Sequence, residues 1–301
     1  MSDNQLIRSS SIMAIGTITS RFTGLIRNLL LVALLGTALL GDTYNVANTM
    51  PNILYNLLIG GALTAVFIPQ IVKSFRDSDG GAAFISRLFT ATLTFLFVLT
   101  LLAIIFTPQI VNIYAPEFAK RPEFDITVSL MRYCLPQIFF LGLFALLGQI
   151  ANAKGRFGPM MWAPVINNLI VIVLFSWFLI NKDQLSISTI TESDLLWLGF
   201  GTTAGYLAQA LILFPLLLRS GIRLKLKFDW QNSQILNSFK LASWSFLYAI
   251  ISQLSYLVTV NLATSAAVKA AASGVSTGVG FTPYANAYLI LILPHSIIAV
   301  S

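Results

Sequence analysis

Residues 11–41 read SIMAIGTITSRFTGLIRNLLLVALLGTALLG, an apolar run that meets its first acidic residue only at Asp42. The run is longer than the about 20 residues that a helix needs to cross a bilayer. It contains Arg21 and Arg27, and a guanidinium at bilayer depth costs roughly 2.5 to 3.5 kcal/mol on insertion scales. Such residues ordinarily face a bundle interior or a watery cavity and meet an anion there. The stretch therefore predicts a membrane helix whose positive charge serves an anionic ligand or partner.

The composition is that of a polytopic membrane protein. Hydrophobic residues make up 56% of the chain and charged residues only 10%, whereas a soluble domain has about 25% charged residues. Runs such as Leu93–Phe106 do not alternate in the way that barrel strands do. The predicted spans are residues 9–37, 43–72, 85–109, 127–153, 159–181, 194–218, 236–266 and 280–301. The predicted fold class is therefore an all-α polytopic membrane protein with about eight transmembrane helices.

The distribution of basic residues predicts the orientation of these helices. With the N-terminus inside, the cytoplasmic side would hold Arg8, Lys73, Arg76, Arg87, Lys154, Arg156, Arg219, Arg223, Lys225, Lys227 and Lys240. The opposite side would hold only Lys120, Arg121, Lys182 and Lys269, mixed with acidic residues. This bias follows the positive-inside rule and predicts a cytoplasmic N-terminus. The net charge of +7 thus reflects membrane topology, and no separate basic helix or aromatic platform points to nucleic acid.

The longest basic loop, Arg219–Lys240, is the best candidate for a boundary inside the chain. Its alternating basic and apolar residues fit either a segment attracted to anionic membrane lipid or a solvated linker. We expect residues 1–219 to form a first unit with six transmembrane helices and residues 220–301 to form a linker and two further helices. The sequence stops at Ser301 without a polar exit from the last span. We therefore expect the chain to be truncated within a second unit.

Polar residues share one face of the first predicted helix. That stripe carries Thr17, Arg21, Gly24 and Asn28. Arg27 lies to its side, and Gly24 leaves room for a bulky head group or a neighbouring helix. The predicted substrate-binding residues are therefore Arg21, Arg27, Gly24 and Asn28. The alternative is that both arginines snorkel to opposite membrane surfaces or only pair with Asp42.

Asp42 opens the second predicted span near the outer surface. It is followed at helical spacing by Asn45, Asn48 and Asn52. One interpretation makes Asp42 a helix N-cap, because a carboxylate satisfies free amides and suits the helix dipole. The other makes it an ion-coupling group or a counter-charge for Arg27. We expect Asp42 and Asn52 to line a cavity.

Helix breaks follow in the same span. Prolines within membrane helices free backbone groups that neighbours or a cavity must satisfy, and transporters place such breaks at sites and hinges. Pro51, Gly60 and Gly61 are the predicted hinge residues.

Sequence motifs of enzymes are absent. The chain has no His-Glu-x-x-His, no Gly-x-Ser-x-Gly and no phosphate-binding loop of the Gly-x-x-x-x-Gly-Lys type. The single cysteine, Cys134, excludes an intrachain disulfide and a Cys-rich zinc site. We expect no metal, no cofactor and no enzymatic activity, and we expect transport driven by an ion gradient or the membrane potential.

Several motifs carry a resemblance to a known family. They are Thr19–Arg27 (TSRFTGLIR), Gly41-Asp42, Met50-Pro51-Asn52, residues 62–69, Ala115–Phe118, Asn152–Asn168 and residues 294–301. The chain resembles the MurJ/MviN family, bacterial lipid II flippases of the multidrug/oligosaccharidyl-lipid/polysaccharide exporter superfamily. The run Ser-Arg-x-x-Gly-x-x-Arg is the most specific part of this resemblance.

The resemblance implies a fold of fourteen helices in two six-helix lobes with two additional helices, of which this chain would be the first lobe and the start of the second. It implies translocation of undecaprenyl pyrophosphate carrying a disaccharide pentapeptide, by alternating access, across the bacterial cytoplasmic membrane. Arg21 and Arg27 match cavity arginines that hold the pyrophosphate, and Asp42 matches a cavity acid. Membrane lipids and proteins of cell-wall synthesis or division are the implied partners.

This sequence departs from the family pattern at several charged positions. The uncharged residues there are Asn28, Tyr55, Asn56, Gly60, Asn286 and Ala287. These departures leave two alternatives open: an ion-coupled exporter of another lipid-linked glycan or of drugs, and a membrane scaffold of cell-wall synthesis that does not transport.

Overall fold

The computed structural model describes residues 3–57, 68–182, 184–219, 221, 224–228, 243–275 and 277–300. Its helices are α1 (Asp3–Leu35), α2 (Leu39–Tyr55), α3 (Ile68–Ser74), α4 (Ala82–Ile105), α5 (Thr107–Tyr114), η3 (Pro116–Phe118), α6 (Pro122–Cys134), α7 (Gln137–Ala153), α8 (Gly158–Asn181), α9 (Glu192–Leu211), α10 (Leu213–Arg219), α12 (Ser243–Ala272) and α13 (Phe281–Val300). The described residues contain no strand. The predicted all-α fold class is confirmed.

Among the described residues, six helical stretches are long and apolar enough to cross a membrane. They are Ser11–Leu35, Ala82–Ile105, Pro122–Ala153, Gly158–Asn181, Glu192–Arg219 and Leu247–Ala272. The predicted span 43–72 corresponds to α2 and α3, and residues 58–67 between them lie outside the described part of the chain. The predicted span 280–301 corresponds to α13, whose segment Phe281–Ile292 is apolar but shorter.

Prolines and their neighbours break several crossings into two helices. Leu135 and Pro136 separate α6 from α7, and Phe106 and Pro108 mark the junction of α4 with α5. Proline lacks the N–H that a helix interior needs, so the helix must bend or stop there. In α2 the helix continues through Pro51, which is buried.

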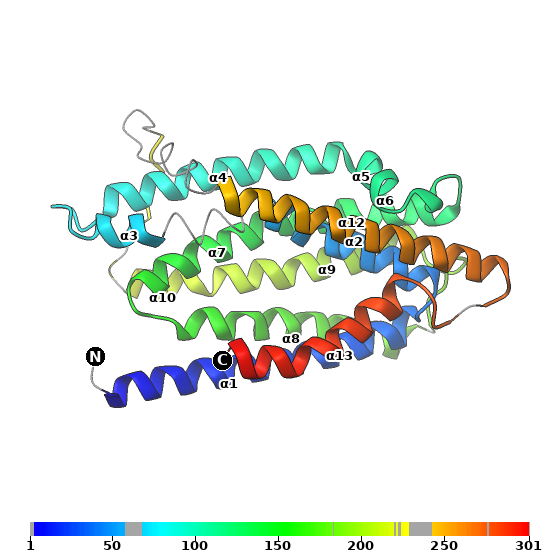
Figure 1. Cartoon of the computed structure of the whole chain (residues 1–301), viewed down its shortest axis with the longest axis horizontal. Helices are drawn as coiled ribbons and strands as arrows, with labels where there is room; N and C mark the ends of the chain where they lie inside the picture. The colour runs from blue at the N-terminus through cyan, green and yellow to red at the C-terminus, as the bar shows by residue number, and fades with distance from the viewer. Residues whose placement is uncertain are drawn as a thin grey trace.

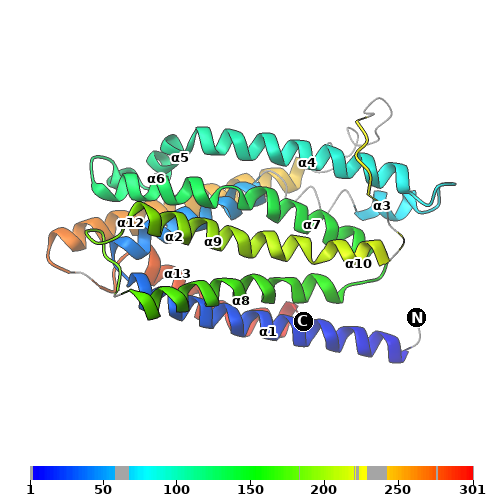
Figure 2. The ribbon, with the colours of Figure 1, turned by 180° about the vertical axis from the view of Figure 1, so that it is seen from behind.

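The helices lie roughly side by side along the long axis of the molecule (Figures 1 and 2). Helix α1 packs along α8, α8 packs on α9, and α2 packs on α6. Helix α12 contacts α2, and α13 contacts both α1 and α2. The helices after residue 242 therefore lean on the bundle made by the helices before residue 220.

Small residues allow the close approach of α1 and α8. A Cβ at Gly16 would lie 2.9 Å from the Cδ1 atom of Trp162. Membrane helices use small residues in this way, because lipid gives them no hydrophobic reason to associate. Farther along the pair, Leu34 is fully buried, and Tyr44 of α2 meets Phe175 of α8 edge-on at 6.0 Å between ring centroids.

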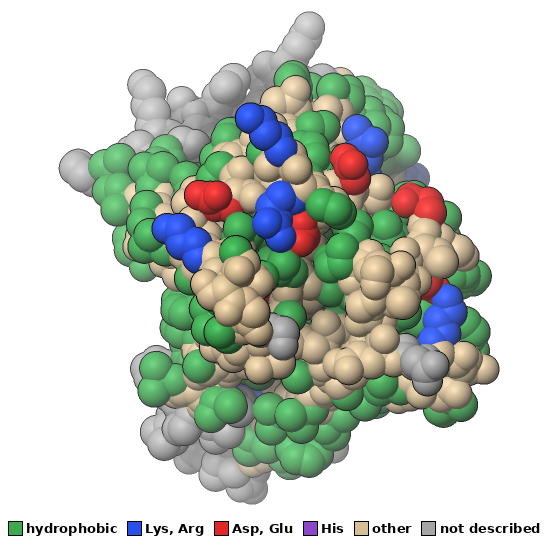
Figure 3. All heavy atoms as spheres, turned by 90° about the vertical axis from the view of Figure 1, so that its right-hand side faces the viewer, with side chains coloured by type: hydrophobic (Ala, Val, Ile, Leu, Met, Phe, Trp, Pro, Cys, Tyr) green, Lys and Arg blue, Asp and Glu red, His purple; other side chains and the backbone are tan. Residues whose placement is uncertain are grey.

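The bundle has two distinguishable ends. We call the end where α1 begins the N-terminal end, and the end that holds the α12–α13 turn the far end (Figure 1). Figure 3 looks onto the far end, where blue and red side chains stand mainly on the upper part and hydrophobic and neutral polar groups cover the lower part. Two ion pairs of this end are Arg121 with Glu123 and Lys182 with Asp194.

Candidate functional site

Arg27 lies inside the bundle formed by the described helices before residue 220. Its guanidinium lies close to Tyr44 on α2 and Tyr206 on α9. The ion pairs of the described residues do not include one between Arg27 and Asp42. Phenol hydroxyls can accept hydrogen bonds from a guanidinium without neutralising it. Arg27 therefore keeps its full positive charge at a partly buried position in the membrane region.

Arg21 is exposed on the same helix. It is seven residues from Asn28, so the two side chains lie on nearly the same stripe of α1. The Asn28 Nδ2 atom donates a hydrogen bond of 2.5 Å to the Oδ1 atom of Asn286 on α13. The stripe that carries Arg21 thus borders α13, the last helix of the chain.

Gly24 and Thr17 lie along the other edge of that stripe, and this edge packs against α8. Asn168 of α8 lies beside Gly24, since a Cβ there would be 3.5 Å from the Asn168 Nδ2 atom. The same Nδ2 atom donates to the Ser20 carbonyl oxygen at 3.0 Å and to the Thr23 hydroxyl at 3.1 Å. The structure therefore places a neighbouring helix, rather than open space, next to Gly24.

Asp42 is completely buried and joins α2 to the beginning of α13. Its Oδ2 atom accepts a hydrogen bond from the Phe281 backbone N–H at 2.9 Å, and its Oδ1 atom accepts one from the Thr282 N–H at 2.7 Å. Asn45, one turn later, donates to the Thr282 hydroxyl at 2.9 Å. The N-cap position of α2 itself is Ala38. Asp42 therefore caps α13 and not its own helix, which satisfies two free amides at the positive end of that helix.

Gly280 permits this contact. Its φ is +137°, a conformation that residues with a side chain rarely adopt, and an added Cβ would overlap the Asp42 Oδ2 atom. The backbone at the start of α13 can come close to the carboxylate only because Gly280 has no side chain.

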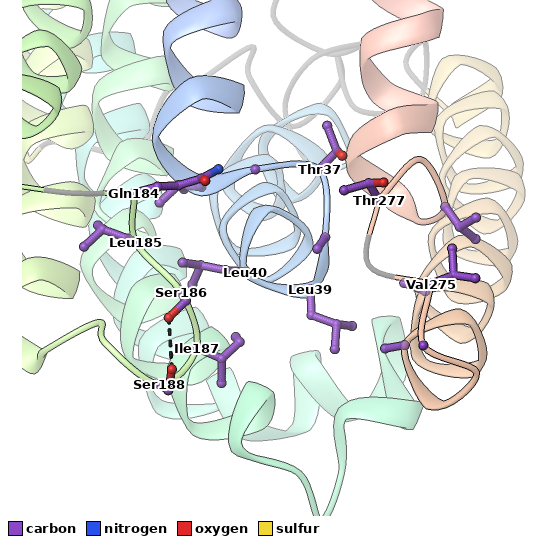
Figure 4. Close-up of a pocket in the computed structure, with 17 residues that line it drawn as sticks. Thr37, Leu39, Leu40, Gln184, Leu185, Ser186, Ile187, Ser188, Val275 and Thr277 are labelled. Carbon is purple, nitrogen blue, oxygen red and sulfur yellow. Dashed lines mark hydrogen bonds between the residues drawn. The ribbon is translucent and has the colours of Figure 1, made fainter.

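Two weaker contacts reinforce the same junction at the far end. The Ser265 hydroxyl of α12 lies 3.1 Å from a Glu117 carboxylate oxygen, and the Gly278 N–H lies 3.4 Å from the Thr37 hydroxyl. A groove of about 600 Å³ lies beside them (Figure 4). It is bordered by residues 35–40, 184–188 and the α12–α13 turn, and a hydrogen bond joins Ser186 and Ser188 across its rim. We call the contacts of Asp42, Asn45, Glu117 and Thr37 with residues 265–282 the far-end latch.

A second cavity lies on the N-terminal side of the latch. Its volume is about 640 Å³, and it lies between α2, α12 and α13. Asn52 of α2 and Asn56, the C-cap residue of that helix, form one side of it, and Tyr256, Tyr284 and Tyr288 contribute to the other. We call it the interhelix cavity. None of the described residues that line it carries a charge.

The structure thus separates the predicted site residues into groups. Asn52 lines the interhelix cavity, Asp42 forms the latch, Asn28 contacts α13, and Arg27 lies within the first bundle. Gly60 and Gly61 lie outside the described residues. The three tyrosines were not predicted, because an isolated tyrosine in an apolar span is indistinguishable from a packing or interfacial residue. The spacing of Phe281, Tyr284 and Tyr288 on one helix face is the signal that could have found Tyr284 and Tyr288, whereas Tyr256 on α12 has no such signal.

Comparison with known proteins identifies the family to which the sequence is similar. The family model described as lipid II flippase MurJ matches residues 31–301. A probable lipid II flippase MurJ of Rickettsia prowazekii (strain Madrid E) is 34% identical over 195 residues, which are 63% of this chain and 38% of that protein. Another from Rhizobium meliloti (strain 1021) is 27% identical over 266 residues, which are 86% of this chain and 48% of that protein. The chain thus spans about half the length, or less, of these curated relatives.

Two solved structures share the fold. A lipid II flippase MurJ in an inward closed conformation matches with a TM-score of 0.70 and 22% identity, covering 96% of this chain and 56% of the other. A MATE protein in complex with MaD3S matches with a TM-score of 0.64 and 17% identity, covering 97% of this chain and 62% of the other. At these identities the likeness concerns the fold alone.

Proposed function

This chain belongs to the lipid II flippase MurJ family, and on that premise we propose that it translocates the lipid-linked peptidoglycan precursor lipid II across the bacterial cytoplasmic membrane by alternating access. In this proposal residues 1–219 form the first lobe, and residues 220–301 form the linker and the first two helices of a second lobe. The N-terminus is cytoplasmic, so the N-terminal end of the bundle faces the cytoplasm and the far end faces outward.

One observation carries the proposal: the two parts of the chain are joined at the far end and enclose a cavity on the other side of the junction. The buried Asp42 carboxylate and its neighbours hold α13 there. The interhelix cavity begins about two turns further along α2 and half a turn to two turns further along α13. An alternating-access transporter needs such a latch, because the site must be closed to one side while it is reached from the other.

The arginines supply the charge that a pyrophosphate requires. Arg21 is exposed on the α1 stripe that borders α13, and it can offer a bidentate fork to a phosphate oxygen pair. Arg27 has no carboxylate partner among the described ion pairs, so its field is not cancelled. In this scheme Arg21 binds the pyrophosphate directly and Arg27 strengthens the positive potential beside it. Asn28 and Gly24 set the distance of α1 from α13 and α8.

Pro51 supports a moving part in the same helix. It lies inside α2, between the latch residues and the cavity residue Asn52, and it removes one backbone hydrogen bond of that helix. We propose that Pro51, together with Gly60 and Gly61, allows the two ends of this segment to move separately.

Transport by the purified full-length protein in proteoliposomes tests this function. Fluorescent lipid II is placed in the inner leaflet, and its arrival outside is measured with an impermeant reducing agent. Loss of one charge-assisted contact of roughly 1.5 to 3 kcal/mol predicts a rate about ten- to one-hundred-fold lower in Arg21→Ala. Arg21→Lys keeps the positive charge but not the bidentate guanidinium. Its transport rate should lie between those of the unmodified protein and Arg21→Ala.

The control is Arg132→Ala, which removes an exposed arginine of α6 in the same bundle. This variant should transport at the original rate. Undiminished lipid II transport in both Arg21→Ala and Arg27→Ala would exclude the proposed role of α1, and no transport by the unmodified protein would exclude the function itself.

A further inference from the structure

The α13 side of the interhelix cavity carries two stacked aromatic rings, Tyr284 and Tyr288. Tyr284 stacks on Tyr288 with ring centroids 6.3 Å apart and an angle of 16° between the planes, and Phe281 continues the stack at 6.4 Å and 23°. Tyr256 of α12 meets Phe281 edge-on at 6.2 Å. Tyr284 and Tyr288 remain 42% and 51% exposed, so ring area is left open to a ligand. The stack holds these rings in place before anything binds.

The other groups that line the cavity are neutral hydrogen-bonding groups. Asn52 lies on α2 and Asn56 is its C-cap, and Ser252, Ser255 and Gln253 lie on α12. The Gln253 Oε1 atom is buried and has no hydrogen-bond partner among the residues that the structure describes. A buried amide oxygen without a partner costs free energy unless a ligand or water supplies a donor.

These two features together select one class of ligand. A phosphate would find no cation among the described residues of this cavity. A hydrocarbon chain would bury the amides and hydroxyls without satisfying them. A sugar ring carries both a C–H face, which stacks on an aromatic ring, and hydroxyl or acetamido groups, which pair with amides and hydroxyls. The volume of about 640 Å³ lies within the roughly 300 to 1,000 Å³ usual for small-molecule sites.

We propose that the interhelix cavity is a carbohydrate subsite, in which Tyr284 and Tyr288 stack on a sugar ring of the lipid-linked head group and Asn52, Asn56 and Gln253 bind its polar groups. This inference rests on the proposed function, because that function brings a disaccharide to the cavity. It assigns the two parts of the head group to different helices: the pyrophosphate to α1 and the sugar to α13.

Binding of two lipids to the full-length protein in nanodiscs tests the subsite. The ligands are lipid II and undecaprenyl pyrophosphate, which has the same anchor and phosphates but no sugar. Tyr284→Ala and Tyr288→Ala should each weaken lipid II binding roughly three- to ten-fold, the range expected for one aromatic contact, and leave undecaprenyl pyrophosphate unchanged. Tyr288→Phe keeps the ring and should retain most of the affinity for lipid II. Tyr133→Ala removes a ring at the C-terminal end of α6, outside the lining of the cavity, and should change the binding of neither ligand.

The soluble disaccharide N,N′-diacetylchitobiose separates this inference from the function. If the unmodified protein binds neither lipid more tightly than phosphatidylglycerol, the proposed function fails, and chitobiose binding that depends on Tyr284 and Tyr288 would still support the subsite. An unchanged ratio of lipid II to undecaprenyl pyrophosphate affinity in both alanine variants would overturn the subsite. So would equal weakening of both lipids, because that result indicates damage to the cavity as a whole.

Discussion

Removal of the Asp42 carboxylate should open the far-end latch. In Asp42→Ala the Phe281 and Thr282 amides lose acceptors at 2.9 and 2.7 Å. Each hydrogen bond to a charged group contributes roughly 1.5 to 3 kcal/mol, and relief from burying the carboxylate offsets part of that sum. A net change of about 2 kcal/mol corresponds to an about thirty-fold shift of the equilibrium toward the state in which the far end is open.

Spin labels across the far end measure this shift. Cysteines at Ser188 in the α8–α9 connection and at Val275 in the α12–α13 turn are both exposed. The native Cys134 is fully buried and should stay unlabelled. Double electron–electron resonance in nanodiscs should show a new population at longer distance in Asp42→Ala.

Two further variants serve as controls for the shift in distance. Asn45→Ala removes only the neutral contact to the Thr282 hydroxyl and should produce a smaller shift. Asp194→Asn alters a carboxylate of the same end that pairs with Lys182, between the end of α8 and the start of α9, and it should leave the distance unchanged. A distance distribution in folded Asp42→Ala identical to that of the unmodified protein would refute the assignment of Asp42 as a latch.

Three further predictions concern helix contacts. Gly280→Ala places a Cβ against the Asp42 carboxylate at a φ of +137° and should mimic Asp42→Ala in the same distance measurement; a distribution unaltered by it would argue against the close approach. Asn168→Ala removes two hydrogen bonds to α1 worth about 0.5 to 1.5 kcal/mol each and should lower the thermal midpoint of the detergent-solubilised protein, whereas an unchanged midpoint would show that water replaces them. Asn28→Leu removes the bond to Asn286 on α13 and should impair transport more than thermal stability, which parallel rate and melting measurements would separate; equal loss of both would point to a purely structural contact.

The sequence was sufficient for the features that depend on local pattern. Length and hydropathy located the spans, since a membrane helix must satisfy its backbone within one continuous apolar segment. The junction at Pro136, which divides one predicted span into α6 and α7, follows from the missing proline N–H.

Partners distant in the sequence could not be predicted in this way. Asp42 had a recognisable chemistry as a cap, but its amides belong to residues 281 and 282, and nothing local connects those positions. Arg27 was expected to meet an anion, yet the groups that the structure places beside it are the phenols of Tyr44 and Tyr206, which hydropathy counts as part of the apolar span. The spacing of Gly24 correctly placed it on the polar stripe of α1. Only the packing of the helices shows that α8, through Asn168, fills the space beside Gly24.

The cap on α13 comes from another helix, and this ties local order to global shape. Gly280, which precedes α13, has no side chain that could accept hydrogen bonds from the first amides of that helix. The acceptor is instead the Asp42 carboxylate of α2. When α13 separates from α2 at the far end, the Phe281 and Thr282 amides must form hydrogen bonds with water. The hydrogen exchange of both amides should then accelerate together. The exchange rates of these two amide protons would then report whether the far end of the whole molecule is open or closed, without an attached label.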